Sequence, residues 1–286
     1  MLRSPSWILM PSAETAAYRL PQELRAQDPY MAVDCGWVDQ MLPFINRFTK
    51  KGDFILDPFA GFGTTAVAAA SLGRHCVGIE LNENRVRIAT LRLRQLENAL
   101  DISQCDRTCP LIVHGDASTY DLLSARCALS SAMLPCRYHL LLTNVPYWWC
   151  RPDSECSGSL YDDQSYSSYL SQCGAIFRRC YDVIEPGGHA VVMCQNLQVR
   201  GKNERFTMVP QAWDVGRILS EAFDELLDEV ILLYPHGHSD EFHRCDRLKN
   251  VQNWSASPAE AISDSGDNSF ASNRCHEYAL IARKKL

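Results

Sequence analysis

Short apolar segments alternate along this chain with longer helix-forming segments, and this alternation restricts the possible folds more than any other feature. Segments 53–57, 75–80 and 111–116 are strand-like, and segments 64–70 and 83–99 between them are helix-like. Strands separated by helices pair in parallel, because each crossover helix returns the chain to the same edge of the sheet. The pattern therefore predicts an α/β domain.

The same alternation continues through the second half of the chain. Further strands are expected at 139–144, 189–193, 229–234 and 277–283, and further helices at 41–50, 165–184 and 213–223. We expect one doubly wound, mostly parallel sheet of seven strands within residues 41–286. Residues 1–40 form an expected N-terminal extension, and the polar stretch 236–274 an expected insertion.

Composition excludes several classes of protein. The 286 residues carry a net charge of −6, which excludes a uniformly basic nucleic-acid coat but allows a local basic face. No stretch approaches the roughly 18 apolar residues of a membrane span, and the run Trp7–Met10 is too short for a signal-peptide core. The 13 cysteines contain no C-x-x-C pair. We therefore expect free thiols, a cytoplasmic location and no membrane partner.

The first candidate site is the turn Asp57–Thr65, DPFAGFGTT, between the first strand and the first helix. Ligands of such sheets bind beyond the carboxyl ends of the strands. Gly61 and Gly63 let the backbone pass close to a ligand, and the helix that follows offers free N–H groups. Glu80 ends the second strand, where it can accept hydrogen bonds from a ribose diol. Asp116 ends the third strand, where it can accept one from an exocyclic amine.

A dinucleotide site is the nearest alternative for this turn. Ala66 stands where the third glycine of G-x-G-x-x-G would be, and Asp57 would repel a pyrophosphate. An acid there favours a cationic ligand instead, such as the ammonium and sulfonium groups of S-adenosylmethionine. A strand-to-helix turn without any ligand is the other alternative.

The second candidate site is Asn144-Val145-Pro146-Tyr147, after the fourth strand. The exocyclic amine of a base is a poor nucleophile, because its lone pair is delocalised into the ring. Hydrogen bonds from the amine to Asn144 Oδ1 and to the carbonyl of Val145 would localise that pair. Pro146 stiffens the turn, and Tyr147 can stack on a flipped base, a contact worth ~1–3 kcal/mol. A purely structural aromatic cluster is the alternative.

The motifs DPFAGFGTT, GIELNENR and NVPYW together resemble those of S-adenosylmethionine-dependent DNA amino-methyltransferases, which methylate cytosine N4 or adenine N6. The resemblance implies a Rossmann-like methyltransferase fold, S-adenosylmethionine as cofactor and DNA as partner. It assigns cofactor binding to Asp57, Pro58, Phe59, Gly61, Gly63, Thr64, Thr65, Glu80 and Asp116. It assigns catalysis to Asn144, Val145, Pro146 and Tyr147, and it implies no metal.

Two residues of the second motif leave the substrate open. The initial Asn144 favours adenine, since cytosine-type members often begin with Ser. Val145 stands where the DNA enzymes usually have proline, and Asn-x-Pro-Tyr is similar to ribosomal-RNA adenine dimethyltransferases. DNA adenine is the favoured target. Cytosine N4 in DNA, RNA adenine, a protein glutamine and a non-catalytic nucleic-acid-binding module are the alternatives. A partner restriction enzyme is a further hypothesis, and the oligomeric state is left undetermined.

Other charged groups carry weaker predictions. Four arginines of the segment 83–99 are expected to form a solvated face, with a phosphate clamp as the alternative: Arg85, Arg87, Arg92 and Arg94. Three cations are candidates for phosphate contacts: Arg200, Lys202 and Arg205. Segment 151–163 and the insertion are candidates for DNA recognition, with a disordered connection as the alternative for the insertion. Histidines and a cysteine of the insertion match no known metal spacing, so a polar loop is expected there: His236, His238, His243 and Cys245.

Overall fold

The computed structural model describes residues 6–32, 34–100, 110–127, 137–148, 165–200, 206–234 and 276–286. The helices are η1 (Ala16–Tyr18), α1 (Gln22–Arg25), α2 (Val38–Phe48), α3 (Thr64–Ser71), α4 (Glu83–Leu100), α5 (Leu122–Cys127), α6 (Tyr166–Val183) and α7 (Gln211–Ala222). The strands are β1 (Trp7–Leu9), β2 (Phe54–Asp57), β3 (His75–Glu80), β4 (Pro110–His114), β5 (Tyr138–Asn144), β6 (Ile184–Cys194), β7 (Leu197–Arg200), β8 (Phe206–Val209), β9 (Glu225–Leu233) and β10 (His276–Arg283).

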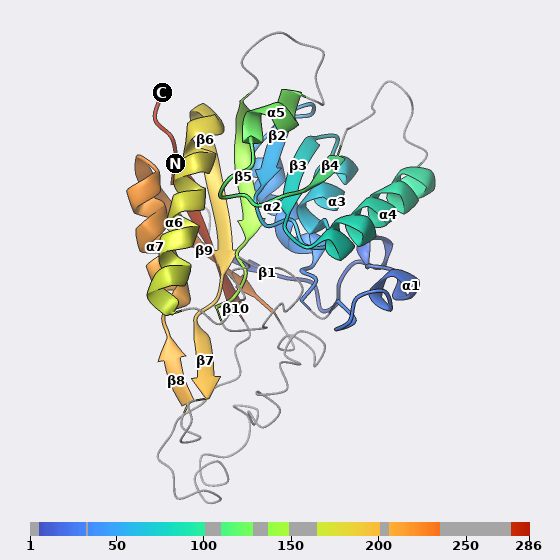
Figure 1. Cartoon of the computed structure of the whole chain (residues 1–286), viewed down its shortest axis with the longest axis horizontal. Coiled ribbons are helices and arrows are strands. Elements are labelled where there is room, and N and C mark those ends of the chain that lie inside the picture. Colours follow the sequence, from blue (N-terminus) through green and yellow to red (C-terminus); the bar gives the residue numbers. More distant parts are fainter. Residues whose placement is uncertain are drawn as a thin grey trace, which may run out of the picture.

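One large sheet forms the centre of the molecule, in the strand order β1-β9-β10-β6-β5-β2-β3-β4 (Figure 1). Strand β10 runs antiparallel to both of its neighbours, and the other pairs are parallel. The expected doubly wound, mostly parallel sheet is thus confirmed. The expected number of strands was wrong, because the sheet has eight strands and not seven.

The additional strand is β1, which lies in the segment expected to be irregular. It pairs in parallel with the edge strand β9, from Trp7 opposite Ile231 to Leu9 opposite Leu233. Three residues are too few to show a strand period, so only the neighbouring edge reveals this strand. The division of the chain at residue 41 stays a prediction, and the stretch 236–274 lies outside the described residues.

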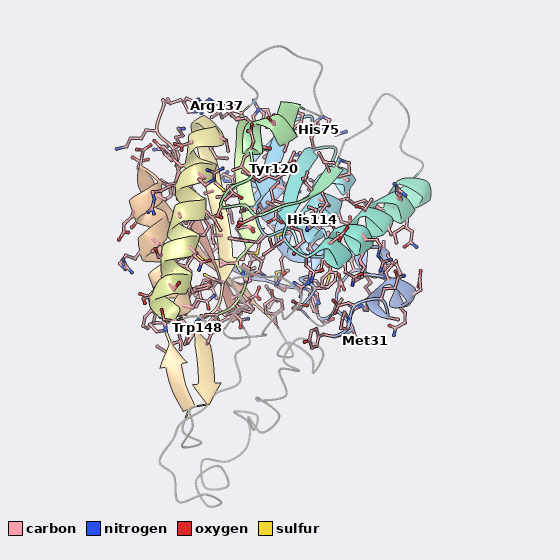
Figure 2. All side chains as sticks on the ribbon, viewed as in Figure 1. Met31, His75, His114, Tyr120, Arg137 and Trp148 are labelled. Carbon is pink, nitrogen blue, oxygen red and sulfur yellow. The ribbon has the colours of Figure 1, made fainter. Side chains whose placement is uncertain are left out.

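Helices cover both faces of the sheet. Helices α2, α3 and α4 pack on one face, and α5, α6 and α7 pack on the other. Neighbouring residues of a strand alternate between these cores: Ile55 belongs to the first and Leu56 to the second. The side chains fill the space between the layers (Figure 2). Among the described residues, no helix is long and apolar enough to cross a membrane.

The direction of winding reverses between β2 and β5, which are adjacent in the sheet. From β2 the chain builds β3 and β4 on one side, and from β5 it builds β6 on the other. The carboxyl ends of β2 and β5 therefore face a crevice, the usual ligand position in such sheets. The antiparallel pair β7–β8 extends beyond the sheet at this edge (Figure 1).

Candidate functional site

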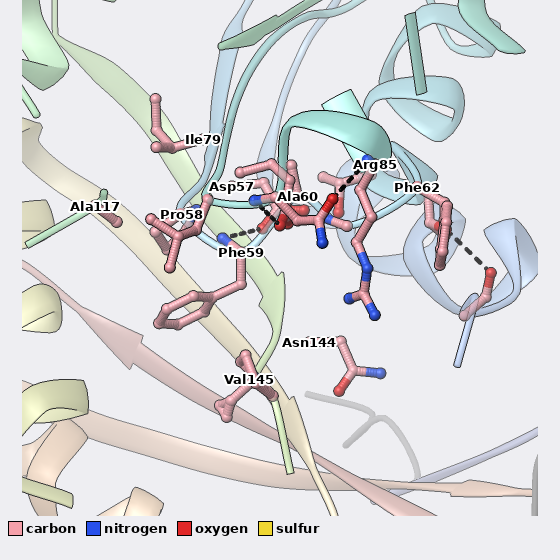
Figure 3. Close-up of a pocket in the computed structure, with 18 of the residues that line it drawn as sticks. Asp57, Pro58, Phe59, Ala60, Phe62, Ile79, Arg85, Ala117, Asn144 and Val145 are labelled. Carbon is pink, nitrogen blue, oxygen red and sulfur yellow. Dashed lines mark hydrogen bonds between the residues drawn. The ribbon is translucent and has the colours of Figure 1, made fainter. Parts of the chain in front are cut away.

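A single cavity lies at the carboxyl ends of β2, β3, β4 and β5 (Figure 3). Its lining includes nearly all residues of the two candidate sites: Asp57, Pro58, Phe59, Gly61, Thr64, Thr65, Glu80, Asp116, Asn144, Val145, Pro146 and Tyr147. Gly63 alone among the predicted site residues does not line it. The structure thus brings the turn after β2 and the motif after β5 to one space.

Two glycines shape the turn between β2 and α3. Gly61 has φ +50°, and a Cβ placed there would meet no described atom within 4 Å. Gly63 has φ +76° and precedes α3, and its added Cβ would lie 3.1 Å from Cβ of Ala89. Gly61 therefore leaves room on the cavity side for a closely approaching ligand. Gly63 allows the left-handed turn and the close packing of α4.

Asp57 is a buried carboxyl at the end of β2. Its Oδ1 accepts hydrogen bonds from the backbone N–H of Phe59 at 3.0 Å and from Thr143 Oγ1 at 2.6 Å. Burial outweighs these bonds and raises the pKa of Asp57 to about 6. A cation in the cavity would favour the ionised form. Sequence reasoning missed Thr143, because a threonine inside an apolar strand gives no local signal of such a contact.

Glu80 holds the glycine turn from the neighbouring strand. Its Oε2 accepts from the N–H of Gly61 at 2.8 Å, and its Oε1 accepts from the N–H of Asn82 at 2.8 Å. Burial raises the pKa of Glu80, although the cation of Arg85 acts in the opposite direction. Asp116 lies in the cavity wall after β4, where its Oδ1 accepts from the N–H of Ser118 at 2.8 Å.

The arginines of α4 do not form one solvated face. Arg85 is buried in the cavity wall, where its Nη2 lies 3.0 Å from Asp34 Oδ2 in an ion pair. Arg92 is also buried, and its Nη1 donates to the carbonyl of Phe62 at 3.1 Å. For these two residues the expectation was wrong, whereas Arg87 and Arg94 are exposed. The reason is tertiary, because segments distant in sequence cover this part of α4.

The N-terminal segment forms a wall of the cavity that sequence reasoning missed. It contributes Asp34, Cys35 and Gly36 to the lining. The carbonyl of Gly36 accepts a hydrogen bond from Thr64 Oγ1 at 3.1 Å, which ties this wall to the start of α3. A Cβ at Gly36 would lie 3.9 Å from Asn144 Nδ2, so the wall also borders the second motif.

Asn144 lines the cavity, and its side chain carries a buried acceptor. No described residue donates a hydrogen bond to its Oδ1, which is shielded from solvent. A buried acceptor without a donor costs about 1–3 kcal/mol. Because Asn144 lines the cavity beside Arg85 (Figure 3), a ligand N–H can supply the missing donor.

The main chain after Asn144 is fixed on both sides. The N–H of Val145 donates to the carbonyl of Met193 at 3.0 Å, which extends the pairing of β5 with β6. Tyr169 Oη donates to the carbonyl of Pro146 at 2.8 Å. Tyr147 Oη donates to Glu277 Oε1 at 3.0 Å. The motif is therefore held rigidly at the carboxyl end of β5.

Several other predicted site residues lie outside the part of the chain that the structure describes. Segment 151–163, the insertion 236–274, Lys202 and Arg205 fall outside the described residues, as does the side chain of Arg200. Within the described ranges, no group of three or more His, Cys, Asp or Glu side chains could hold a metal ion.

Known proteins match this chain in the region that contains the glycine turn. Residues 38–91 match the model of a DNA methylase family. A segment of 45 residues is 53% identical to the Type II methyltransferase M2.DpnII of Streptococcus pneumoniae, covering 16% of this chain and 17% of that protein. Another of 63 residues is 43% identical to the putative methylase YubD of Escherichia coli, covering 22% and 28%. The matches thus span less than a third of each relative. Over this region the resemblance to DNA amino-methyltransferases is confirmed.

Solved structures overlap the chain more widely but less closely. A putative methyltransferase from Bacillus halodurans has a TM-score of 0.49 and 15% identity, over 87% of this chain and 99% of that one. A magnesium protoporphyrin IX methyltransferase from Synechocystis, solved with bound S-adenosylmethionine, has a TM-score of 0.46 and 11% identity, over 87% and 78%.

Proposed function

We propose that this chain transfers the methyl group of S-adenosylmethionine to an exocyclic amino group of a base in DNA, with adenine N6 as the favoured target. The observation that carries the proposal is the shared cavity, which Asp57 and Asn144 line together. The match of residues 38–91 to a DNA methylase family supports the same chemistry.

The carboxyl groups of the cavity fit S-adenosylmethionine. Asp57, Glu80 and Asp116 place three carboxyl groups in the lining, and the ligand carries ammonium and sulfonium cations. A cation stabilises the ionised form of a buried carboxyl, which is the form that burial disfavours at Asp57. Gly61 leaves space beside the turn. When bound, the cofactor supplies a methyl group activated by its positive sulfur.

Asn144 is the residue proposed to activate the target amine. Its unpaired Oδ1 accepts a hydrogen bond from the amine, and the carbonyl of Val145 accepts a second. Two such bonds draw the nitrogen toward tetrahedral geometry and localise its lone pair. The rigid turn at Pro146 keeps these acceptors in place, so proximity and orientation supply much of the rate. Tyr147 stacks on the base, which is flipped out of the duplex.

The choice of base and of nucleic acid rests on the motif itself. An initial Asn144 supports adenine N6, with cytosine N4 as the alternative in DNA. Val145 in place of proline supports RNA adenine as the second candidate. A protein glutamine as the substrate and a cofactor-binding module without catalysis are the remaining alternatives. The same transfer experiment separates all of them.

The test is transfer of tritiated methyl from S-adenosylmethionine to unmethylated DNA, to ribosomal RNA and to protein, followed by digestion and separation of the products. We expect label in N6-methyladenine from DNA. Asn144→Ala should lower transfer about a hundredfold, the usual scale for losing one preorganised polar group, while calorimetry shows unchanged cofactor binding. Equal transfer by this variant would refute the assignment of Asn144. Cofactor binding without transfer by the wild type would favour the non-catalytic module.

The cellular setting is proposed on the same basis. We propose DNA as the macromolecular partner, the cytoplasm as the location, and a restriction enzyme as a cognate activity. The names of the matched Type II methyltransferases support the last point. Mapping of modified bases in cells with and without the gene tests this setting. We expect methylated sites in DNA that are present with the gene and absent without it.

A further inference from the structure

A buried carboxylate at the start of β10 holds the tyrosine of the second motif. Glu277 has no exposed surface, and four side chains donate to it. Its Oε1 accepts from Tyr147 Oη at 3.0 Å and from Gln195 Nε2 at 3.2 Å. Its Oε2 accepts from Gln40 Nε2 at 2.6 Å and from Tyr234 Oη at 3.0 Å. We call these five residues the Glu277 cluster.

The cluster joins parts of the chain that are far apart in sequence. Its members come from α2, from the loop after β5, and from the segments after β6 and β9, in addition to β10. A buried carboxylate is costly unless it is fully hydrogen-bonded, so each donor contributes to keeping this group inside. Burial and Glu277 together raise the pKa of Tyr147 well above its usual value. The phenol therefore remains protonated and keeps donating.

The cluster fixes the ring of Tyr147 at its far end. The ring is held at its backbone by the turn at Pro146, whose carbonyl accepts from Tyr169 Oη at 2.8 Å, and at its hydroxyl by Glu277. An aromatic ring anchored at both ends of its long axis stays in one place. A stacking partner must hold its ring at a fixed place beside an extruded base, because stacking is lost when the ring swings away.

Gln40 links the Glu277 cluster to the cavity wall formed by the N-terminal segment. Gln40 donates to Glu277 through Nε2, and its Oε1 accepts from the N–H of Trp37 at 3.1 Å. A Cβ at Gly36 would lie 3.2 Å from the same Oε1. Glu277 is thus linked through Gln40 to the segment that borders Asn144.

We infer that Glu277 is a positioning residue for the target base, acting through the hydroxyl of Tyr147. The inference rests on the proposed function, since it needs a base to be positioned. A carboxylate that only stabilises the fold would affect stability alone. A positioning carboxylate also affects the rate of transfer at saturating DNA.

Two tyrosines provide a matched pair for the test. Tyr147→Phe and Tyr234→Phe each remove one hydroxyl that donates to Glu277, at opposite oxygens. Glu277→Gln keeps the shape of the side chain and changes its hydrogen bonding. Each variant is measured for kcat and KM with unmethylated DNA, for the Kd of S-adenosylmethionine and for Tm.

We expect Glu277→Gln and Tyr147→Phe each to lower kcat about tenfold and to leave the Kd for the cofactor unchanged. A tenfold loss corresponds to about 1.4 kcal/mol, which lies within the ~1–3 kcal/mol of one base-stacking contact. The double variant should be no slower than either single one, because both break the same link. Tyr234→Phe should lower Tm similarly to Tyr147→Phe but change kcat less than about twofold.

Two results would overturn the inference by itself, given transfer by the wild type. One is an equal effect of Tyr147→Phe and Tyr234→Phe on kcat. The other is a double variant whose losses multiply. Absence of transfer by a wild type that still binds the cofactor would instead refute the proposed function, and the inference would fall with it.

Discussion

Asp57 gives the proposed cofactor site a specific dependence on pH. Its carboxyl is buried, with a pKa of about 6, and the proposed ligand is a cation that binds the ionised form. Affinity for S-adenosylmethionine should therefore fall as the solution is acidified through pH 6. Asp57→Asn should remove this dependence, because the amide carries no titratable proton while its Oδ1 can still accept from Phe59 and Thr143.

The magnitude follows from the pKa. With a pKa of about 6, about nine-tenths of Asp57 is ionised at pH 7 and about one-tenth at pH 5. The Kd of the free protein for S-adenosylmethionine should thus rise about tenfold from pH 7 to pH 5. The ammonium group of the ligand has a pKa of about 8, as α-amino groups do, so it stays charged between pH 5 and pH 7.

Isothermal titration calorimetry at pH 5, 6, 7 and 8 measures the effect, with the ionic strength held constant. We expect the wild type to bind with a midpoint near pH 6 and Asp57→Asn to bind weakly with a flat profile. A flat wild-type profile between pH 5 and pH 7 would refute the reasoning. An Asp57→Asn profile as steep as that of the wild type would assign the titration to another group, such as Glu80.

Three further predictions concern the same turn. The pKa of Asp57 is higher in the folded chain than its ordinary 3.8, so ionisation costs about 3 kcal/mol and the free energy of unfolding falls as pH rises from about 4 to about 6. Asp57→Asn should consequently raise the Tm of the free protein at pH 7, by differential scanning calorimetry. Thr143→Val removes a donor to Asp57 and should move the binding midpoint up by about one pH unit, by calorimetric titration; an unmoved midpoint would contradict the role of that bond. Gly61→Ala places a methyl group on the open side of a turn with φ +50° and should weaken cofactor binding about tenfold. Gly73→Ala, at φ +76° and outside the cavity, should lower Tm without changing the Kd.

The local sequence pattern was sufficient to predict the strands and helices that carry the site. The expected segment 75–80 is β3 as the structure has it, and the expected strands 53–57 and 139–144 match β2 and β5 to within one residue. A strand period and a glycine turn are short-range properties, so they can be read from neighbouring residues. The carboxyl ends of parallel strands meet at one edge, which is why Asp57, Glu80, Asp116 and Asn144 could be expected together.

Some boundaries were wrong because pairing with a distant strand overrode the local signal. The run Glu185-Pro186-Gly187-Gly188 was expected to separate a helix from a strand at 189–193. The structure continues β6 through this run, from Ile184 to Cys194. Proline and glycine are unfavourable within regular strands, but the register of β6 against β5 shifts at this run, from Ile184 opposite Tyr138 to His189 opposite Leu140. Such an irregularity accommodates them, and it depends on the partner strand.

The contacts between the site residues and distant side chains depend on the tertiary structure alone. Thr143 reaches Asp57 across 86 positions of sequence, and Glu277 reaches Tyr147 across 130. Arg85 is polar and lies on a helix, so its sequence predicts a solvated side chain, yet Asp34 and the cavity wall bury it. Periodicity and turn chemistry determine which residues stand at the ends of the strands. Which distant side chain each of them meets depends on how the whole chain packs, because burial and pairing are properties of the assembled layers.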